Sequence, residues 1–283
     1  MKKTIYSTLL ISSLLLAGCQ DNSESPADET DTGADTTEQV DDTETNENES
    51  SDDSSEEVEE EEKEEEVAYK YKVNRNTFAI EPINPEENAD EKLVLLTFDD
   101  APYGNTMQIA DTLAERDVSA LFFVNGMYME EEEGFETMQE IPDMGFEIGH
   151  HTHTHATLND SMYSEEDIHA EILKTSDIVE EAIGERPRFF RAPHGIMTDY
   201  AEQVVAEEGM SWMNWSFGYD WEVQYQDAEA LADITLNTEL LGNGTNILMH
   251  DRTWTADAVP AIVDGLLEQG FTIVDPKLIS HEE

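Results

Sequence analysis

The sequence predicts an α/β fold, a distorted (β/α) barrel of seven or eight units, over residues 67–283. Short apolar runs that suit strands buried on both faces alternate along this region with amphipathic segments that suit helices. Strands that alternate with helices are parallel and are joined by right-handed crossovers. Polar clusters also follow several of the predicted strands, and in a (β/α) barrel the chemistry lies at the strand C-termini.

The predicted strands are short apolar runs bounded by polar or turn residues. The first, Lys92–Phe98, reads KLVLLTF and is apolar at consecutive positions, as expected of a strand that is buried on both faces. The predicted strands are Lys92–Phe98, Ser119–Val124, Phe146–His151, Arg188–Pro193, Met210–Phe217, Thr245–Asp251 and Phe271–Asp275.

The predicted helices lie between these strands. The longest is Ser164–Gly184, which opens on Ser-Glu-Glu-Asp, an N-cap followed by an acidic first turn, and closes on a glycine. The other predicted helices are the stretch Ile109–Arg116 and the segments Phe135–Met144, Tyr200–Glu208, Ala228–Leu241 and Ala256–Gln269.

Residues 1–18 are typical of a secretory signal peptide. Lys2 and Lys3 precede an apolar run, Ile5–Ala17, which is too short to span a membrane comfortably. The run ends in Leu-Leu-Ala-Gly-Cys, which resembles the lipobox of bacterial lipoproteins and predicts lipidation of Cys19. An ordinary secretory signal with a chance cysteine is the alternative. Because Cys19 is the only cysteine, disulfides and cysteine catalysis are excluded.

Residues 19–66 are predicted to form a disordered acidic linker, because they carry almost no apolar side chains that could offset the entropy of ordering. The whole chain has a formal net charge of -53, which repels nucleic acid phosphates and anionic membranes. We therefore expect no nucleic acid partner and a membrane contact through the lipid anchor alone. The folded domain, 67–283, is expected to be a monomer on the outer face of the cell membrane of a Gram-positive bacterium.

The pair Asp99 and Asp100 directly follows the first predicted strand. Adjacent carboxylates repel each other unless a positive group separates their roles. A bound cation would do so if one aspartate ligates it and the other remains as a base. A simple turn with an Asx cap is the alternative, but the position after a buried strand favours a functional role.

The segment Gly149–Leu158 holds four of the eight histidines. His151, His153 and His155 alternate, which suits one face of a strand, whereas His151 and His155 are four apart, which suits one face of a helical turn. The spacing leaves the ligand pair open. One carboxylate and two imidazoles suit zinc with a position left for water, which then becomes a nucleophile near neutral pH. A histidine-rich metal scavenger is the alternative.

Three further residues stand at or near predicted strand ends. Arg191 could pair with a carboxylate through two hydrogen bonds, although a surface ion pair is the common role of a single arginine. His250 ends an apolar strand, and a loop histidine with satisfied hydrogen bonds is its alternative. Trp221 could belong to the core. Their joint placement with the aspartates and histidines favours one functional site.

In this order, TFDD, HTHTH read as H-T-x-x-H, RAPHG, DW and LMH resemble the five motifs of the NodB-homology polysaccharide deacetylases, carbohydrate esterase family 4. The match spans Leu93–Asp275. The resemblance implies a metal-dependent hydrolase that removes N-acetyl groups from N-acetylglucosamine residues of a cell-wall glycan, with peptidoglycan as the first candidate. Chitin oligomers, poly-N-acetylglucosamine and acetyl-xylan are alternative substrates. A non-catalytic wall-binding lipoprotein is the alternative of another class.

The resemblance also implies a ligand set for a divalent metal, Zn²⁺ first and Co²⁺ or Mn²⁺ as alternatives. The set is Asp100, His151 and His155. Thr152 would support the loop by hydrogen bonding, and His153 would be a variable filler. His150, where relatives often have Asn, would lie behind the ligands or compete with them.

The chemistry implied by the resemblance needs a base, an acid and an acetyl pocket. Asp99 would be the base, oriented by Arg191, and His250 the acid, with its pKa raised by Asp220. The metal and the backbone N–H of His194 would hold the oxyanion, and Trp221 and Leu248 would line the acetyl pocket.

The motifs depart from the family pattern at three places. Phe217 stands where the fourth motif usually has an acid, and the segment SFGYDW is one residue short, so the match at Asp220 is less direct. His194 replaces a frequent Tyr, and His150 replaces Asn. The segments Tyr128–Gly134 and Tyr219–Gln226 are expected to be loops that shape the glycan groove.

Overall fold

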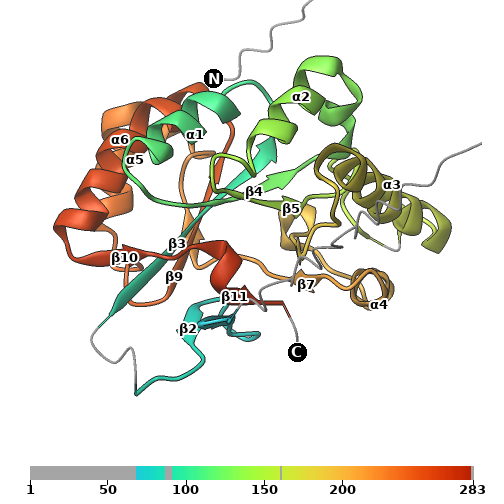
Figure 1. Cartoon of the computed structure of the whole chain (residues 1–283), viewed down its shortest axis with the longest axis horizontal. Coiled ribbons are helices and arrows are strands. Elements are labelled where there is room, and N and C mark those ends of the chain that lie inside the picture. The colour runs from blue at the N-terminus through green and yellow to red at the C-terminus, as the bar shows by residue number, and fades with distance from the viewer. Residues whose placement is uncertain (1–67, 87–90, 160, 282–283) are drawn as a thin grey trace, which may run out of the picture. The chain divides into compact units, whose positions relative to one another are not determined.

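The computed structural model describes residues 68–86, 91–159 and 161–281, and Figure 1 shows its helices and strands. The predicted signal peptide, Cys19 and the acidic linker 19–66 lie outside the described residues. Within the described part, no helix has both the length and the apolar character needed to cross a membrane.

An eight-stranded parallel sheet forms the centre of the fold. Its strands are β3 (Lys92–Ala101), β4 (Leu121–Val124), β5 (Glu147–His150), β6 (Phe189–Phe190), β7 (Ser211–Trp212), β8 (Phe217–Gly218), β9 (Thr245–His250) and β10 (Phe271–Ile273). The hydrogen-bonded order is β7-β6-β5-β4-β3-β9-β8, and β10 pairs with the first residues of β3. All of these pairings are parallel, as the alternation of predicted strands and helices requires.

Helices cover the outside of this sheet (Figure 1). They are α1 (Thr106–Ala114), α2 (Glu132–Glu140), α3 (Glu165–Ile183), α4 (Asp199–Glu207), α5 (Ala228–Asn237) and α6 (Thr253–Glu268). Four single-turn 3₁₀ helices are η1 (Gly126–Glu130), η2 (Pro193–Gly195), η3 (Val223–Tyr225) and η4 (Pro276–Leu278). As predicted, α3 begins at the N-cap Ser164, which forms a capping box with Asp167, and ends at the left-handed Gly184.

The central strand β3 is buried on both faces, which explains its continuous apolar sequence. Val94 and Leu96 belong to the core between the sheet and the helices, whereas Leu93 and Leu95 belong to a second core on the other face. That second core is covered by a small three-stranded sheet of β1 (Tyr71–Val73), β2 (Ile80–Pro82) and β11 (Ile279–Ser280). The sequence analysis did not predict this sheet, because its strands are only two or three residues long.

The segment Met210–Phe217 is not one strand, and this part of the prediction is wrong. The chain forms β7, leaves the sheet, and returns as β8 at the opposite end of the strand order. In the connection, the Met213 N–H donates to the Phe190 carbonyl (2.8 Å) and the Ser216 N–H donates to the Asn246 carbonyl (2.8 Å). The connection thus spans from β6 to β9 and completes a distorted barrel without direct pairing of β7 with β8.

A buried carboxylate holds the loop between β3 and α1. Asp251, which directly follows β9, is fully buried, and its two oxygens accept the N–H groups of Tyr103 (2.8 Å), Gly104 (3.1 Å) and Asn105 (2.6 Å). The hydroxyl of Thr106 also donates to it (2.5 Å). The loop that follows the Asp99–Asp100 pair is therefore tied to the end of β9.

We expect Asp251→Ala to lower the free energy of unfolding by about 3 kcal/mol, because three backbone N–H groups and the Thr106 hydroxyl would lose a charged acceptor. Chemical denaturation followed by far-UV circular dichroism measures the change. Asp257→Ala is the matched control, because the Asp257 carboxylate accepts a hydrogen bond from Gln108 at the exposed surface (3.2 Å) and should change stability little. Equal losses of unfolding free energy in the two variants would contradict a stabilising role of the hydrogen bonds to Asp251.

Candidate active site

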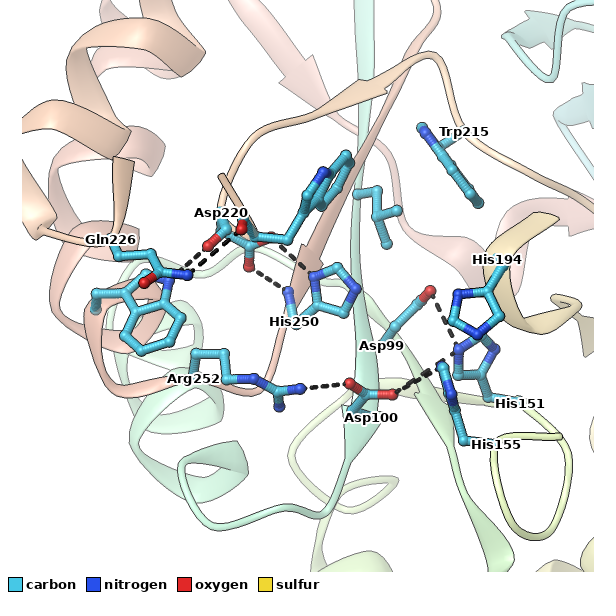
Figure 2. A pocket seen from close by; sticks show the side chains of 13 residues that line it. Asp99, Asp100, His151, His155, His194, Trp215, Asp220, Gln226, His250 and Arg252 are labelled. Carbon is cyan, nitrogen blue, oxygen red and sulfur yellow. Dashed lines mark hydrogen bonds and ion pairs between the residues drawn. The ribbon is translucent and has the colours of Figure 1, made fainter. Parts of the chain in front are cut away.

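A cavity of about 570 Å³ opens where the C-terminal ends of the parallel strands meet. Residues at or after the ends of β3, β5, β6, β8 and β9 line it, and Figure 2 shows their side chains. The cavity gathers every residue to which the sequence analysis assigned chemistry in the folded domain, except Arg191, which lies directly behind it. The polar clusters at the predicted strand ends therefore do converge.

The two adjacent aspartates both face this cavity. Consecutive residues of a regular strand point to opposite faces, but Asp100 has a φ of 64°, so the backbone turns at this position. Asp99 is 2 % exposed and Asp100 is 8 % exposed. Left-handed backbone at a residue other than glycine is strained and clusters at functional sites. Three more cases in this site are Thr152, His155 and His194.

One carboxylate and two imidazoles form a cluster suited to a metal ion. The ligand atoms of Asp100, His151 and His155 all lie within 4.8 Å of one another. The Asp100 Oδ1 atom is 3.9 Å from Nε2 of His151 and 3.5 Å from Nε2 of His155. Figure 2 shows the two rings converging on this carboxylate.

The chemistry of these three residues fits a divalent cation. The Oδ1 atom of Asp100 is buried and has no hydrogen-bond partner in the described part of the chain, which is costly unless another positive group satisfies it. The Nδ1 atom of His151 is 2.7 Å from the carbonyl oxygen of Arg191, so its other nitrogen, Nε2, is the one directed at the cluster. This donor set of one oxygen and two nitrogens is suited to zinc.

Burial favours the neutral form of both histidines, which is the form that binds a metal. Burial lowers the pKa of His151, against the opposing charges of Asp99 and Asp100. Burial and then the neighbouring His151 lower the pKa of His155 to about 4. The pKa of Asp100 is also lowered: burial would raise it, but the surrounding histidines and Arg252 outweigh burial. The cluster thus offers one anionic and two neutral ligands.

His153 points away from this cluster. Its Nε2 atom is 2.8 Å from Nζ of Lys174 and 3.5 Å from the Glu130 carboxylate, on the outer side of the loop. Spacing alone allowed either His151 and His153 or His151 and His155 as the ligand pair. The structure places His151 and His155 together with Asp100, and His153 outside this cluster.

His150 cannot compete for a metal, so that alternative is wrong. Its ring is fully buried, with Nε2 2.7 Å from the Ile172 carbonyl oxygen and Nδ1 accepting the Thr152 N–H (3.1 Å). Burial lowers the pKa of His150 to about 3. Thr152 does support the loop by hydrogen bonding: its backbone N–H donates to His150, whereas its buried hydroxyl has no partner among the described residues.

Arg191 is fully buried and fixes Asp99. Its Nη1 donates to Asp99 Oδ1 (2.7 Å) and to the Thr97 hydroxyl (2.7 Å), and its Nη2 donates to the Asn214 carbonyl (3.0 Å). The guanidinium group also stacks on Phe123, with 4.2 Å to the ring centroid. The other oxygen of Asp99, Oδ2, lies 3.6 Å from Nε2 of His151. This carboxylate is thus fixed by Arg191 at the edge of the metal cluster.

His250 and Asp220 form a second polar pair across the cavity. Asp220 is fully buried, and its Oδ1 is 2.8 Å from Nδ1 of the His250 ring. Its Oδ2 accepts hydrogen bonds from the backbone N–H of His250 (2.6 Å) and from the Thr255 hydroxyl (2.8 Å). Burial would lower the pKa of His250, but the hydrogen bond and charge of Asp220 outweigh it and raise the pKa. The segment SFGYDW is one residue shorter than the family motif, yet Asp220 contacts His250 as the resemblance implied.

The apolar part of the cavity lies beside His250. Leu248 is 3 % exposed and Trp221 is 45 % exposed, with the Trp221 ring edge-on to His250 at 5.6 Å between centroids. His194 contributes more than its backbone, because its imidazole lines the cavity and packs edge-on against His155 at 4.9 Å.

Of the two segments expected to shape the groove as loops, one lines the cavity. Trp221 and Gln226 of the segment Tyr219–Gln226 do so. The segment Tyr128–Gly134 is not a loop: it forms the end of η1 and the start of α2, and it does not line this cavity. Its run of four glutamates obscured the helix start in the sequence.

Three cavity residues were missed by the sequence analysis: Trp215, Arg252 and Trp254. Arg252 directly follows the motif that contains His250, and its Nη2 donates to Asp100 Oδ2 (2.7 Å). Its position just after a strand end was the available signal. The tryptophans carried no local pattern that distinguishes a cavity wall from the core.

The chain is similar to known polysaccharide deacetylases. Residues 86–213 match the family model described as polysaccharide deacetylase. The chain is 30% identical, over 71% of its length, to a peptidoglycan-N-acetylglucosamine deacetylase of Bacillus cereus, of which the match covers 74%. It is 31% identical, over 72% of its length, to the peptidoglycan-N-acetylmuramic acid deacetylase PdaC of Bacillus subtilis, of which it spans only 43%.

Solved structures share the fold. The structure of PdaC from Bacillus subtilis superposes with a TM-score of 0.58 at 31% identity, covering 65% of this chain and 88% of that one. A CE4 family pseudoenzyme from Bacillus anthracis superposes with a TM-score of 0.58 at 26% identity, covering 65% of this chain and 63% of that one. The fold is therefore shared by active and inactive proteins.

We expect His155→Ala to weaken Zn²⁺ binding by at least about 100-fold. Removing a residue that only hydrogen-bonds to a metal ligand already lowers metal affinity by roughly 10–100-fold, and removing a ligand itself should lower it more. Isothermal titration with Zn²⁺ measures the affinity. The matched control is His153→Ala in the same loop, whose side chain faces Lys174 and Glu130 and should leave the affinity unchanged. If His153→Ala abolishes binding and His155→Ala does not, the ligand pair is wrong.

Proposed function

Because the chain belongs to the polysaccharide deacetylase family, we propose that it is a metal-dependent hydrolase that removes N-acetyl groups from N-acetylglucosamine residues of a cell-wall glycan, with peptidoglycan as substrate. The observation that carries this proposal is the convergence of three sets of side chains on one cavity. They are the metal cluster of Asp100, His151 and His155, the Asp99–Arg191 pair, and the His250–Asp220 pair.

Asp100, His151 and His155 would hold the divalent ion, and Zn²⁺ is proposed from the mixed oxygen and nitrogen donor set. When bound, such an ion polarises a carbonyl group and lowers the pKa of water. The remaining steps follow from the protein's own groups. Asp99, fixed by Arg191, accepts a proton from the water that attacks the acetamide carbonyl.

His250 then donates a proton to the leaving amine, so that acetate and a free amino sugar are released. The position of His250 supports this role. Asp220 holds the imidazole through Nδ1, so Nε2 is the nitrogen left to act in the cavity that His250 lines. Leu248 and Trp221 offer an apolar wall beside His250 for the acetyl methyl group.

The activity is tested by acetate release from peptidoglycan, chitin oligomers, poly-N-acetylglucosamine and acetyl-xylan, each with and without a chelator. We expect release from peptidoglycan, its loss on chelation, and a fall of roughly 10²–10⁴-fold in Asp99→Asn, the range that a general base contributes. Asp99→Asn should keep its Zn²⁺. Release from another polymer alone would change the proposed substrate. Release from none, with glycan binding retained, would favour the non-catalytic wall-binding alternative.

The pH dependence follows from the role of His250 as an acid. An acid must carry its proton, so activity is present below the pKa of His250 and is lost as the pH rises through it. Asp220 raises that pKa. Asp220→Asn should therefore move the alkaline limb of the kcat/KM profile to lower pH and reduce the maximal rate. An unmoved alkaline limb would exclude His250 as the group that titrates there.

The proposed location is the outer face of a bacterial cell membrane, with the domain held near the wall by Cys19 and the acidic linker. The motif Leu-Leu-Ala-Gly-Cys supports it. Cys19→Ala should move the protein from the membrane fraction to the soluble fraction of cells, because the lipid would have no attachment site. Detection by immunoblot measures the partition, and Ser23→Ala is the control near the same terminus. Membrane retention of Cys19→Ala would contradict the anchor.

A further inference from the structure

Arg252 is the only lysine or arginine that lines the cavity in the described part of the chain. It stands at the N-cap of α6, directly after β9 and Asp251. The position places a permanent positive charge beside the reaction centre of a protein whose net charge is -53. Figure 2 shows its side chain reaching toward Asp100 from the side opposite His151 and His155.

The guanidinium group is held in a defined orientation. Its Nη2 donates to Asp100 Oδ2 (2.7 Å), its Nη1 donates to the Asp251 carbonyl (2.8 Å), and its plane packs over the Tyr103 ring at 4.8 Å. These bonds use two of the five N–H groups of an arginine. Its side chain is 29 % exposed, so the group faces the cavity rather than being enclosed. A fixed, partly exposed guanidinium is suited to binding a carboxylate.

A divalent cation in the metal site would offset the charge of Asp100, which is the carboxylate that Arg252 contacts. Asp99 is paired with Arg191, and Asp220 is paired with His250. Asp100 carries one negative charge, which a divalent cation more than neutralises. Arg252 would then lie beside a centre of the same sign, which is unfavourable in a partly buried site unless an anion joins it.

We propose that Arg252 is a specificity-determining residue that binds a carboxylate on the glycan, next to the acetamide group that is hydrolysed. The ligand class is an acidic amino sugar polymer, such as a glycan with a lactyl ether, rather than neutral N-acetylglucosamine chains. This rests on the proposed function for the identity of the reacting group, but the binding preference can be measured without turnover.

The test compares two ligands that differ only in charge. One is a tetrasaccharide of alternating N-acetylglucosamine and N-acetylmuramic acid with free lactyl carboxylates, and the other is its methyl ester. Binding is measured by isothermal titration with the Zn²⁺-loaded full chain in the Asp99→Asn background, which keeps the ligand intact. We expect the acid to bind roughly tenfold or more tightly than the ester, as a charge-assisted hydrogen bond implies.

Arg252→Gln should remove the difference between acid and ester while binding of the ester changes little. The matched control is Arg116→Gln, which removes an arginine–aspartate pair with the same 2.7 Å separation at the surface between Arg116 and Asp264, and which should keep the preference. The Zn²⁺ content of each variant is determined alongside, because Arg252 also contacts Asp100.

Two results would overturn the proposal: equal binding of acid and ester by the protein with Arg252 intact, or a preference that survives Arg252→Gln. If Arg252→Gln weakens both ligands equally, the residue only positions Asp100. The outcome is separable from that of the proposed function, because a protein that prefers the acid but releases no acetate would retain this inference and lose the deacetylase activity.

Discussion

The site depends on burying two adjacent carboxylates in one cavity and compensating each of them differently. Asp99 and Asp100 are consecutive in the chain, and an uncompensated buried carboxylate would take up a proton rather than stay ionised. Asp99 is bonded to the guanidinium group of Arg191, whereas Asp100 faces two neutral imidazoles and Arg252. This difference leaves Asp99 fixed by Arg191 and Asp100 with one oxygen available to a cation.

Arg191, which compensates Asp99, also contacts the segment that completes the barrel. Arg191 donates to the Asn214 carbonyl, and the side-chain amide of Asn246 donates to the same oxygen (3.0 Å). Asn214 lies in the connection between β7 and β8, where the strands do not pair with each other. Arg191 therefore links the aspartate of β3 to this irregular part of the barrel wall, so one buried side chain contacts both Asp99 and the connection that closes the fold.

The comparison with the pseudoenzyme separates the fold from the activity. A protein of the same fold at 26% identity is a pseudoenzyme, so the parallel sheet and its helices are not sufficient for hydrolysis. In this chain the proposed activity depends on a few side chains and their partners. The ligand cluster, the Asp99–Arg191 pair and the His250–Asp220 pair are all present and in contact.

Local sequence was sufficient for the helices and for the longer strands of the central sheet, and for the residues that end those strands. The apolar runs of β3 and β9 and the capped helix α3 follow from burial and capping, which act within a few residues, and the motifs that end the strands identified Asp99, Asp100 and His250. It could not identify the break between β7 and β8, because pairing with β6 and β9 decides it. It could not choose between His153 and His155 by spacing, or assign Arg252. Those outcomes depend on left-handed turns and on side chains from distant strands, which meet only when the sheet has curled.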